Sequence, residues 1–178
     1  MFLSYLLVPF PICIFLHTNI NVVYKNVRFL KTDPKARWQG YLFYFNEGFC
    51  WSDISDTRIR ARIKNNGIYD VKSMSLFSRL SDIPDFYFIC LLNSSFVGKY
   101  IKEFLNNTVS FQINDARKIP VIIPTQDQLF ELKKIFDKSV EIQKQKFDKT
   151  ITNTVADTML QEQTEVLDKL VLRLYFST

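Results

Sequence analysis

A run of seven residues in the first half of the chain alternates between basic and apolar side chains. It contains the cations Arg58, Arg60, Arg62 and Lys64, separated by Ile59, Ala61 and Ile63. A period of two is typical of a half-buried β-strand, whereas a helix would spread the four cations around its circumference. We therefore predict a strand with one face against the core and one strongly basic face.

A tight turn is expected to follow this strand. Asn66-Gly67 offers the two positive-φ positions that a short hairpin prefers, so the segment 68–72 is predicted to pair back on the basic strand. Between Arg58 and Arg79 there are six basic residues and one acidic residue. A polyanion such as nucleic acid would stabilise this concentration of charge, and a solvated surface strand is the alternative interpretation.

The composition favours one compact domain with an appendage. The 178 residues are 47% hydrophobic and 15% aromatic, which is enough to build a core and argues against global disorder. The net charge of +5 permits binding to DNA, RNA or another anionic surface. Three widely spaced cysteines favour neither a disulfide framework nor a metal site, so we expect a reducing cytoplasm. The single histidine, His17, has no cysteine at zinc spacing, and no metal site is predicted.

The first sixteen residues carry no charge, and three interpretations of them stay open. They can form buried strands, continue the interior of a longer chain, or act as a targeting or membrane segment. A signal peptide would normally begin with a basic residue, and spanning a bilayer needs ~20 apolar residues. Pro9 and Pro11 also interrupt the run, so we predict no membrane partner.

Two helices are predicted in the middle of the chain. The first begins at Pro84 with Ser81 or Asp82 as its cap, and the segment 86–92 is apolar on every side, which predicts burial. The second begins at Ser94 or Ser95 and ends at residues 106–107. An alternating β-like segment at 108–112, a polar turn at 114–117 and an extended segment at 119–124 are expected next.

Two C-terminal helices are predicted to fold back as a hairpin. Thr125 and Gln128 form a capping box, which marks the start of the first helix, and that helix continues to about residue 149. The segment 150–154 is rich in Thr and Asn and breaks the run, before a second helix at about 155–175. Its heptad seam spans only two heptads, which is too short to fix an oligomeric state. The hairpin is expected to bury Phe136, Val140 and Phe147 against Leu160, Leu167 and Leu174.

Motifs for catalysis are absent from the sequence. The four glycines stand far apart, so no nucleotide-binding loop is present, and one histidine in an apolar run supports no Ser-His-Asp or Cys-His pair. Pairs such as Asp82 and Asp85 are better explained by capping and loop solvation. No catalytic residue is predicted.

Three blocks, taken in order, resemble a known family. They are 47–55 with the basic strand and 69–77, then 86–95 with 100–101, and finally 105–120 with 123–125 and Gln128. They are similar to the TaqI-like C-terminal specificity domain of bacterial restriction-modification N6-adenine DNA methyltransferases and fused type II restriction-methylation enzymes. The resemblance covers residues 38 to about 147.

The resemblance implies an α+β fold and a function in DNA recognition. The expected architecture is a small mixed β-sheet target-recognition domain with buried helices, followed by a C-terminal helical hairpin or coiled-coil-like arm. Such a domain reads a short DNA sequence and presents it to a catalytic domain. We divide the chain into an apolar N-terminal segment (1–36), a DNA target-recognition domain (37–124) and a helical arm (125–178).

The family's methyltransferase motifs are missing from this sequence. Neither an S-adenosylmethionine glycine motif nor Asn-Pro-Pro-Tyr is present, so no cofactor is expected in this chain. S-adenosylmethionine is expected only in an attached or partner methyltransferase domain. A truncated gene product, a fragment and a stand-alone specificity subunit all stay open. The expected partners are double-stranded DNA and a methyltransferase or restriction catalytic domain or subunit.

Candidate DNA-binding residues follow from the chemistry of the side chains. Arginine suits phosphates and guanine, Asn suits adenine, and Ser can add phosphate hydrogen bonds. The candidates are Arg58, Arg60, Arg62, Lys64, Asn65, Asn66, Lys72, Ser73 and Ser75. Turn chemistry alone is the alternative for the two asparagines. For the whole chain, the alternatives are a helical protein–protein interaction module with an incidental basic surface and an RNA-binding module.

Overall fold

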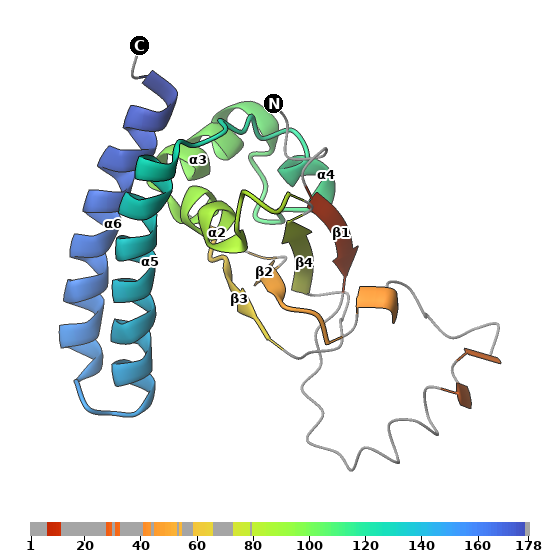
Figure 1. Ribbon diagram of the computed structural model, residues 1–178, viewed down its shortest axis with the longest axis horizontal. Coiled ribbons are helices and arrows are strands. Elements are labelled where there is room, and N and C mark those ends of the chain that lie inside the picture. Colours follow the sequence, from red (N-terminus) through yellow and green to blue (C-terminus); the bar gives the residue numbers. More distant parts are fainter. Residues whose placement is uncertain are drawn as a thin grey trace.

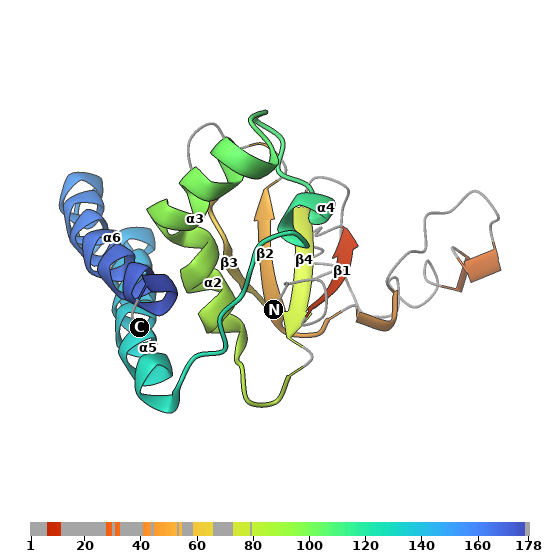
Figure 2. The same cartoon turned by 90° about the horizontal axis from the view of Figure 1, so that it is seen from above.

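The structure is a computed structural model, and the part of the chain that it describes comprises residues 7–11, 28–29, 31–32, 41–43, 45–52, 54, 59–65, 73–78 and 80–176. These residues form an antiparallel sheet and several helices, so the predicted α+β class is confirmed. Figure 2 shows three layers: the C-terminal hairpin, a middle layer of two helices, and the sheet.

The sheet has four described strands in the order β1-β4-β2-β3. They are β1 (Leu7–Pro11), β2 (Gly48–Ser52), β3 (Arg62–Lys64) and β4 (Ser73–Ser78). All three neighbouring pairs are antiparallel, whereas we predicted a mixed sheet. Pro9 and Pro11 lie in β1, at one edge of this sheet, where a missing backbone N–H costs no ladder hydrogen bond.

The described neighbour of the basic strand is a strand that precedes it in the chain. β3 pairs with the earlier strand β2, with Phe49 opposite Ile63, and β4 lies on the other side of β2. The Asn66-Gly67 turn and the returning segment 68–72 lie outside the described residues. Local sequence reveals turns better than it reveals pairing between segments that are distant along the chain.

The strand β2 is the centre of the sheet and is almost entirely buried. Its Phe49 ring stacks on Phe88 with the centroids 5.9 Å apart, and Trp51 Nε1 donates a hydrogen bond to the Phe111 carbonyl oxygen over 3.1 Å. A Cβ atom at Gly48 would lie 2.6 Å from the backbone oxygen of Leu76, so this close approach of β2 to β4 requires glycine.

The middle layer begins with α2 (Asp85–Asn93), and residues 87–92 of this helix are all buried, as predicted. The predicted cap was wrong, because Pro84 occupies the N-cap position and offers no side-chain hydrogen bond. Instead, the Asp85 carboxylate accepts a hydrogen bond from Ser78 N–H over 2.8 Å and so ties the helix to β4. Burial raises the pKa of Asp85, and the hydrogen bond from Ser78 opposes that shift.

The second helix of this layer begins where the sequence predicted. Ser94 caps α3 (Ser95–Tyr100), which continues as the π-helix η3 (Ile101–Leu105) and ends at Asn106. Within the described part of the chain, residues 108–112 form one isolated bridge, between Ser110 and Ile54, and no strand. A short helix, α4 (Ile113–Ala116), replaces the predicted polar turn because Gln112 and Asp115 form a capping box. A 3₁₀ helix, η2 (Tyr41–Phe43), precedes β2.

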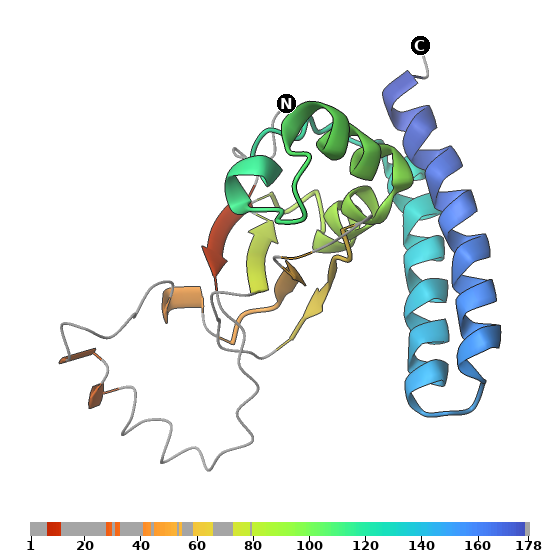
Figure 3. The same ribbon diagram turned by 180° about the vertical axis from the view of Figure 1, so that it is seen from behind.

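The C-terminal hairpin is present and consists of α5 (Gln126–Phe147) and α6 (Asn153–Phe176) (Figure 1). The Thr125–Gln128 capping box is confirmed. The predicted apolar stripe is confirmed in part: Leu167 and Leu174 are buried, whereas Phe147 is 86% exposed. Phe147 stands at the last residue of α5, where no described part of α6 covers it. Viewed from behind, the hairpin extends well past the sheet (Figure 3).

The hairpin shares its core with the rest of the described chain. α5 packs on α2 and α6 packs on α3. Leu132 and Val171 belong to the same buried cluster as Phe49 and Phe88. The division of the chain at residue 124 stays a prediction. No helix within the described residues is long and apolar enough to cross a membrane.

An extended segment connects the middle layer to α5, and two tyrosines hold it in place. Tyr87 of α2 donates its hydroxyl hydrogen to the Ile122 carbonyl oxygen, and Tyr175 of α6 donates to that of Pro120, each over 2.6 Å. Burial raises the pKa of both phenols, that of Tyr175 to about 12. The two bonds fix the hairpin to α2 through this segment.

We expect Leu167→Asp to unfold the hairpin, because Leu167 is only 7% exposed and a buried carboxylate without a partner is costly. The free energy of unfolding should fall by about 3 kcal/mol or more. The matched control is Leu172→Asp on the same helix, where the side chain is 42% exposed and the loss should be about 1 kcal/mol or less. Chemical denaturation measures both values. Equal losses would contradict the packing described.

We expect Tyr175→Phe to lower the free energy of unfolding by about 1 kcal/mol at neutral pH, because one buried hydrogen bond is lost. The folded pKa of Tyr175 is raised above its ordinary value of 10.0 to about 12. Its contribution is therefore fully present below about pH 10 and is lost as the pH rises toward 12. The wild type should lose stability faster than the variant over this window. Urea unfolding at several pH values tests this, and parallel curves would contradict it.

Candidate nucleic-acid interface

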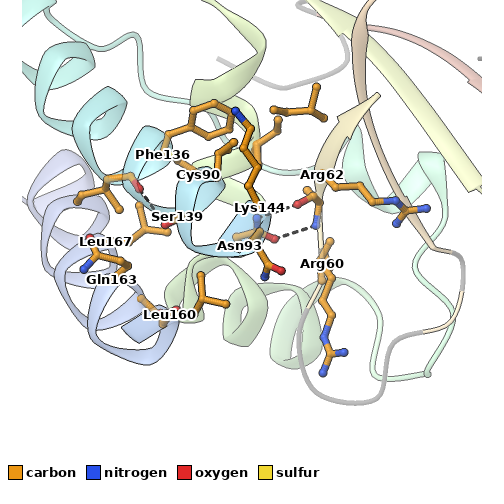
Figure 4. Close-up of a pocket in the computed structure, with 18 of the residues that line it drawn as sticks. Arg60, Arg62, Cys90, Asn93, Phe136, Ser139, Lys144, Leu160, Gln163 and Leu167 are labelled. Atoms are coloured by element: carbon orange, nitrogen blue, oxygen red, sulfur yellow. Dashed lines mark hydrogen bonds between the residues drawn. The ribbon is translucent and has the colours of Figure 1, made fainter. Parts of the chain in front are cut away.

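The segment 59–62 presents two arginines to solvent along the edge of the sheet. Ile59 and Ala61 are 5% and 8% exposed, whereas the side chains of Arg60 and Arg62 between them are exposed. This part of the predicted alternation is confirmed. Figure 4 shows that both arginine side chains extend away from α5. The Arg62 guanidinium also donates a hydrogen bond to the Ser52 hydroxyl on β2 over 3.3 Å, a contact that sequence analysis missed.

The backbone between the two arginines is held by a side chain of α2. Ala61 N–H donates to Asn93 Oδ1 over 2.8 Å, and Asn93 Nδ2 donates back to the Ala61 carbonyl oxygen over 2.9 Å (Figure 4). The Asn93 amide therefore pairs with the segment much as a neighbouring strand would. Sequence analysis included Asn93 only within the block 86–95 and gave no signal for this contact.

The alternation ends after Arg62, which corrects the prediction for Lys64. Ile63 is 42% exposed, whereas Lys64 is only 2% exposed. The Lys64 ammonium donates a hydrogen bond to the Asn46 carbonyl oxygen over 2.8 Å and lies 4.8 Å from the centroid of the Phe77 ring. A long apolar stem lets lysine bury its side chain when its charge finds an acceptor and an aromatic face. Lys64 therefore belongs to the packing of the sheet.

Ser75 is also placed inside the protein. It is fully buried in β4, so the prediction that its hydroxyl faces a phosphate is corrected. Its strand β4 is an inner strand of the sheet, between β1 and β2. Asn65 is exposed just beyond β3 and follows Arg62 by three residues. Four candidates cannot be placed: Arg58, Asn66, Lys72 and the side chain of Ser73 lie outside the described residues.

A groove of about 870 Å³ separates the arginine segment from the hairpin. Residues 59–63 form one wall, α2 contributes Cys90 and Asn93 to the floor, and α5 and α6 form the opposite wall. Lys144 of α5 lines this wall (Figure 4). The sequence predicted a basic strand and a helical arm separately, and the structure brings them to two sides of one groove.

The polar and titratable side chains of this region differ in what they can do chemically. Burial raises the pKa of the Cys90 thiol to about 12, so it is protonated at neutral pH and a weak nucleophile. Within the described residues, no group of three His, Cys, Asp or Glu side chains is arranged to hold a metal ion. Exposed guanidinium groups beside an exposed amide are suited to bind anions.

Comparisons with known proteins find a likeness among solved structures. No family model and no curated protein matches the chain. Among solved structures, the type IIL restriction-modification enzyme MmeI, determined in complex with DNA, aligns with 89% of this chain at a TM-score of 0.54. The chain shares this fold with part of MmeI.

The likeness has a defined extent. The two sequences are 13% identical over the alignment, so the comparison concerns the fold. The aligned region covers 25% of the MmeI chain, and this protein therefore spans about a quarter of that enzyme. The described fold is thus found within a restriction-modification enzyme. The finer resemblance to a TaqI-like specificity domain stays a prediction.

Proposed function

We propose that this chain is the sequence-specific DNA recognition part of a restriction-modification DNA adenine methyltransferase. The observation that carries the proposal is the exposed pair Arg60 and Arg62. The backbone between these two arginines is held by Asn93 of α2. Two exposed guanidinium groups that are two residues apart on a held backbone suit a polyanion better than a small neutral ligand. A DNA complex of MmeI, whose fold this chain shares in part, supports the same interpretation.

The DNA contacts proposed for each exposed side chain follow from its chemistry. Arg60 and Arg62 contact phosphates or the guanine edge, and Asn65 is suited to adenine. Among the described residues, these three are the predicted candidates that reach solvent. Lys64 supports the strand from inside, through its bond to Asn46. The arginines therefore supply most of the electrostatic attraction that the described segment can offer.

A separate catalytic domain or subunit completes this proposal. The sequence lacks both the glycine motif and the Asn-Pro-Pro-Tyr motif of adenine methyltransferases. The partner therefore binds S-adenosylmethionine and transfers the methyl group, while this chain binds double-stranded DNA in the cytoplasm as a TaqI-like specificity domain. The projecting hairpin is available for contact with that partner.

A protein–protein interaction module is the second candidate function. The exposed aromatic side chains Phe147 and Phe176 on the hairpin favour it, with exposed fractions of 86% and 68%. Exposed aromatic residues are enriched in protein interfaces. Under this alternative the arginine pair is dispensable, so the same arginine variants distinguish the two functions.

We expect the purified chain to bind duplex DNA with an affinity that falls as salt increases. Arg60→Ala combined with Arg62→Ala should weaken binding to all sequences. It should also reduce the slope of log affinity against log salt by about 1.8, because each lost phosphate contact removes about 0.9. Fluorescence anisotropy with a labelled duplex at several salt concentrations measures both effects.

The matched control removes the same charge from the hairpin. Lys169→Ala combined with Arg173→Ala changes two exposed cations on α6. This control should leave the salt slope close to that of the wild type. Equal effects in the two double variants would indicate unspecific attraction to net charge. An absence of DNA binding by the folded wild type would contradict the proposed function and favour the interaction module.

We expect no methylation of DNA by this chain alone, since its sequence lacks both methyltransferase motifs. Incubation with labelled S-adenosylmethionine and DNA of mixed sequence should leave the DNA unlabelled. An intact adenine methyltransferase under the same conditions is the positive control. Transfer of label by a clean preparation of this chain would overturn the assignment of catalysis to a partner.

A further inference from the structure

We propose that Asn93 is the positioning residue of this DNA interface. Its side-chain amide fixes the backbone between Arg60 and Arg62 and so determines where the two guanidinium groups meet DNA. This inference rests on the proposed function and adds a residue from a different element, α2. Asn93 acts through the arginines, because its amide oxygen and its amide nitrogen are both hydrogen-bonded to the Ala61 backbone.

The contact has the geometry of a strand pairing. The two hydrogen bonds join the N–H and the carbonyl oxygen of one residue, Ala61, to the oxygen and nitrogen of one side chain, at 2.8 and 2.9 Å. A carboxamide offers a donor and an acceptor side by side, as a peptide group does. Aspartate would keep the acceptor but lose the donor, and leucine would have neither. The position is therefore selective for asparagine.

The amide is attached to a rigid frame. Asn93 is the last residue of α2, and the two residues before it, Leu91 and Leu92, are each 2% exposed. Just after it, the Ser94 hydroxyl donates to the Leu91 carbonyl oxygen over 2.8 Å. Ser95 N–H then donates to the carboxylate of Asp168 on α6 over 2.7 Å. The end of α2 is thus fixed from the core and from the hairpin.

The strand segment needs this support because it lies at the edge of the described sheet. β3 begins only at Arg62, so Arg60 and Ala61 precede the part of the segment that pairs with β2. Without Asn93, the partly buried N–H and carbonyl groups of Ala61 would lose their partners, and the backbone would move to find others. The backbone that carries the arginines would then have to be ordered at the moment of binding, which weakens affinity.

A purely structural role for Asn93 predicts different behaviour. If the amide only stabilised the fold, its loss would lower stability without altering how the arginines contribute to binding. Asn106 provides a matched control, since its Nδ2 donates to the Ser110 carbonyl oxygen over 2.9 Å and to the Asp115 carboxylate over 2.8 Å. Its Oδ1 also accepts hydrogen bonds from the N–H and the hydroxyl of Thr108 over 2.9 and 2.7 Å. Asn106→Ala therefore removes at least as many side-chain hydrogen bonds as Asn93→Ala, but in a different part of the fold.

The test is a double-mutant cycle on the full chain with a labelled duplex as the probe. Asn93→Ala should lower affinity about tenfold, the size expected when the backbone of about one residue must be ordered on binding. In the background of Arg60→Ala and Arg62→Ala, the same change should alter affinity less than about twofold, because coupled residues are not additive. Asn106→Ala should leave the affinity of the folded protein unchanged.

Hydrogen exchange without DNA supplies a second measurement. Asn93→Ala should speed deuterium uptake by the peptide covering 59–65, and Asn106→Ala should not. Additive effects in the cycle, or unchanged uptake at 59–65, would overturn the positioning role. If the wild type binds no DNA while Asn93→Ala still speeds uptake, the proposed function fails and the contact of Asn93 with the strand stands.

Discussion

The burial of α2 is the constraint on which the other described elements depend. Its six consecutive buried residues contact the sheet on one side and the hairpin on the other. A helix that is apolar all round has to be covered on every face. The sheet alone cannot do this, so α5 and α6 become part of the core. The part of the hairpin that extends beyond α2 is therefore anchored to the core at one end.

This arrangement explains why the two predicted features of the chain meet. The basic segment contacts α2 through Ala61, and the hairpin contacts α2 through α5. Both are positioned by the same helix, so the groove between them has a floor of fixed shape. Movement of the hairpin relative to the strand would require α2 to give up buried apolar surface, which is costly. A ligand on the arginines would accordingly meet a surface formed before binding.

Local sequence patterns predicted those helices whose start or burial depends on residues close by in the sequence. The capping box of Thr125 and Gln128, the cap at Ser94 and the all-apolar α2 depend on neighbours within a few residues. Lys64 shows the limit of this reasoning. Its burial depends on Asn46 and Phe77, which are distant in sequence, and the alternating pattern alone assigned it to the exposed face.

The interface was predictable only in part for the same reason. The exposure of Arg60 and Arg62 followed from the period of two, whereas the choice of β2 as partner strand depends on tertiary pairing. The contact between Asn93 and Ala61 joins residues 32 positions apart in the chain. An asparagine at the end of a helix commonly interacts with its own backbone, so its sequence position gave no indication of a partner strand.

Both outer strands of the described sheet carry features that hinder self-association. Open edges invite another chain to add a strand, and proline or charged side chains oppose this. On β1, Pro9 and Pro11 lack the N–H groups that an added strand would need. Beside β3, the positive charges of the arginines repel those of a second copy. The Asn93 amide is already hydrogen-bonded to the Ala61 backbone. The charge that we propose attracts a polyanion would thus also oppose edge-to-edge pairing of two copies.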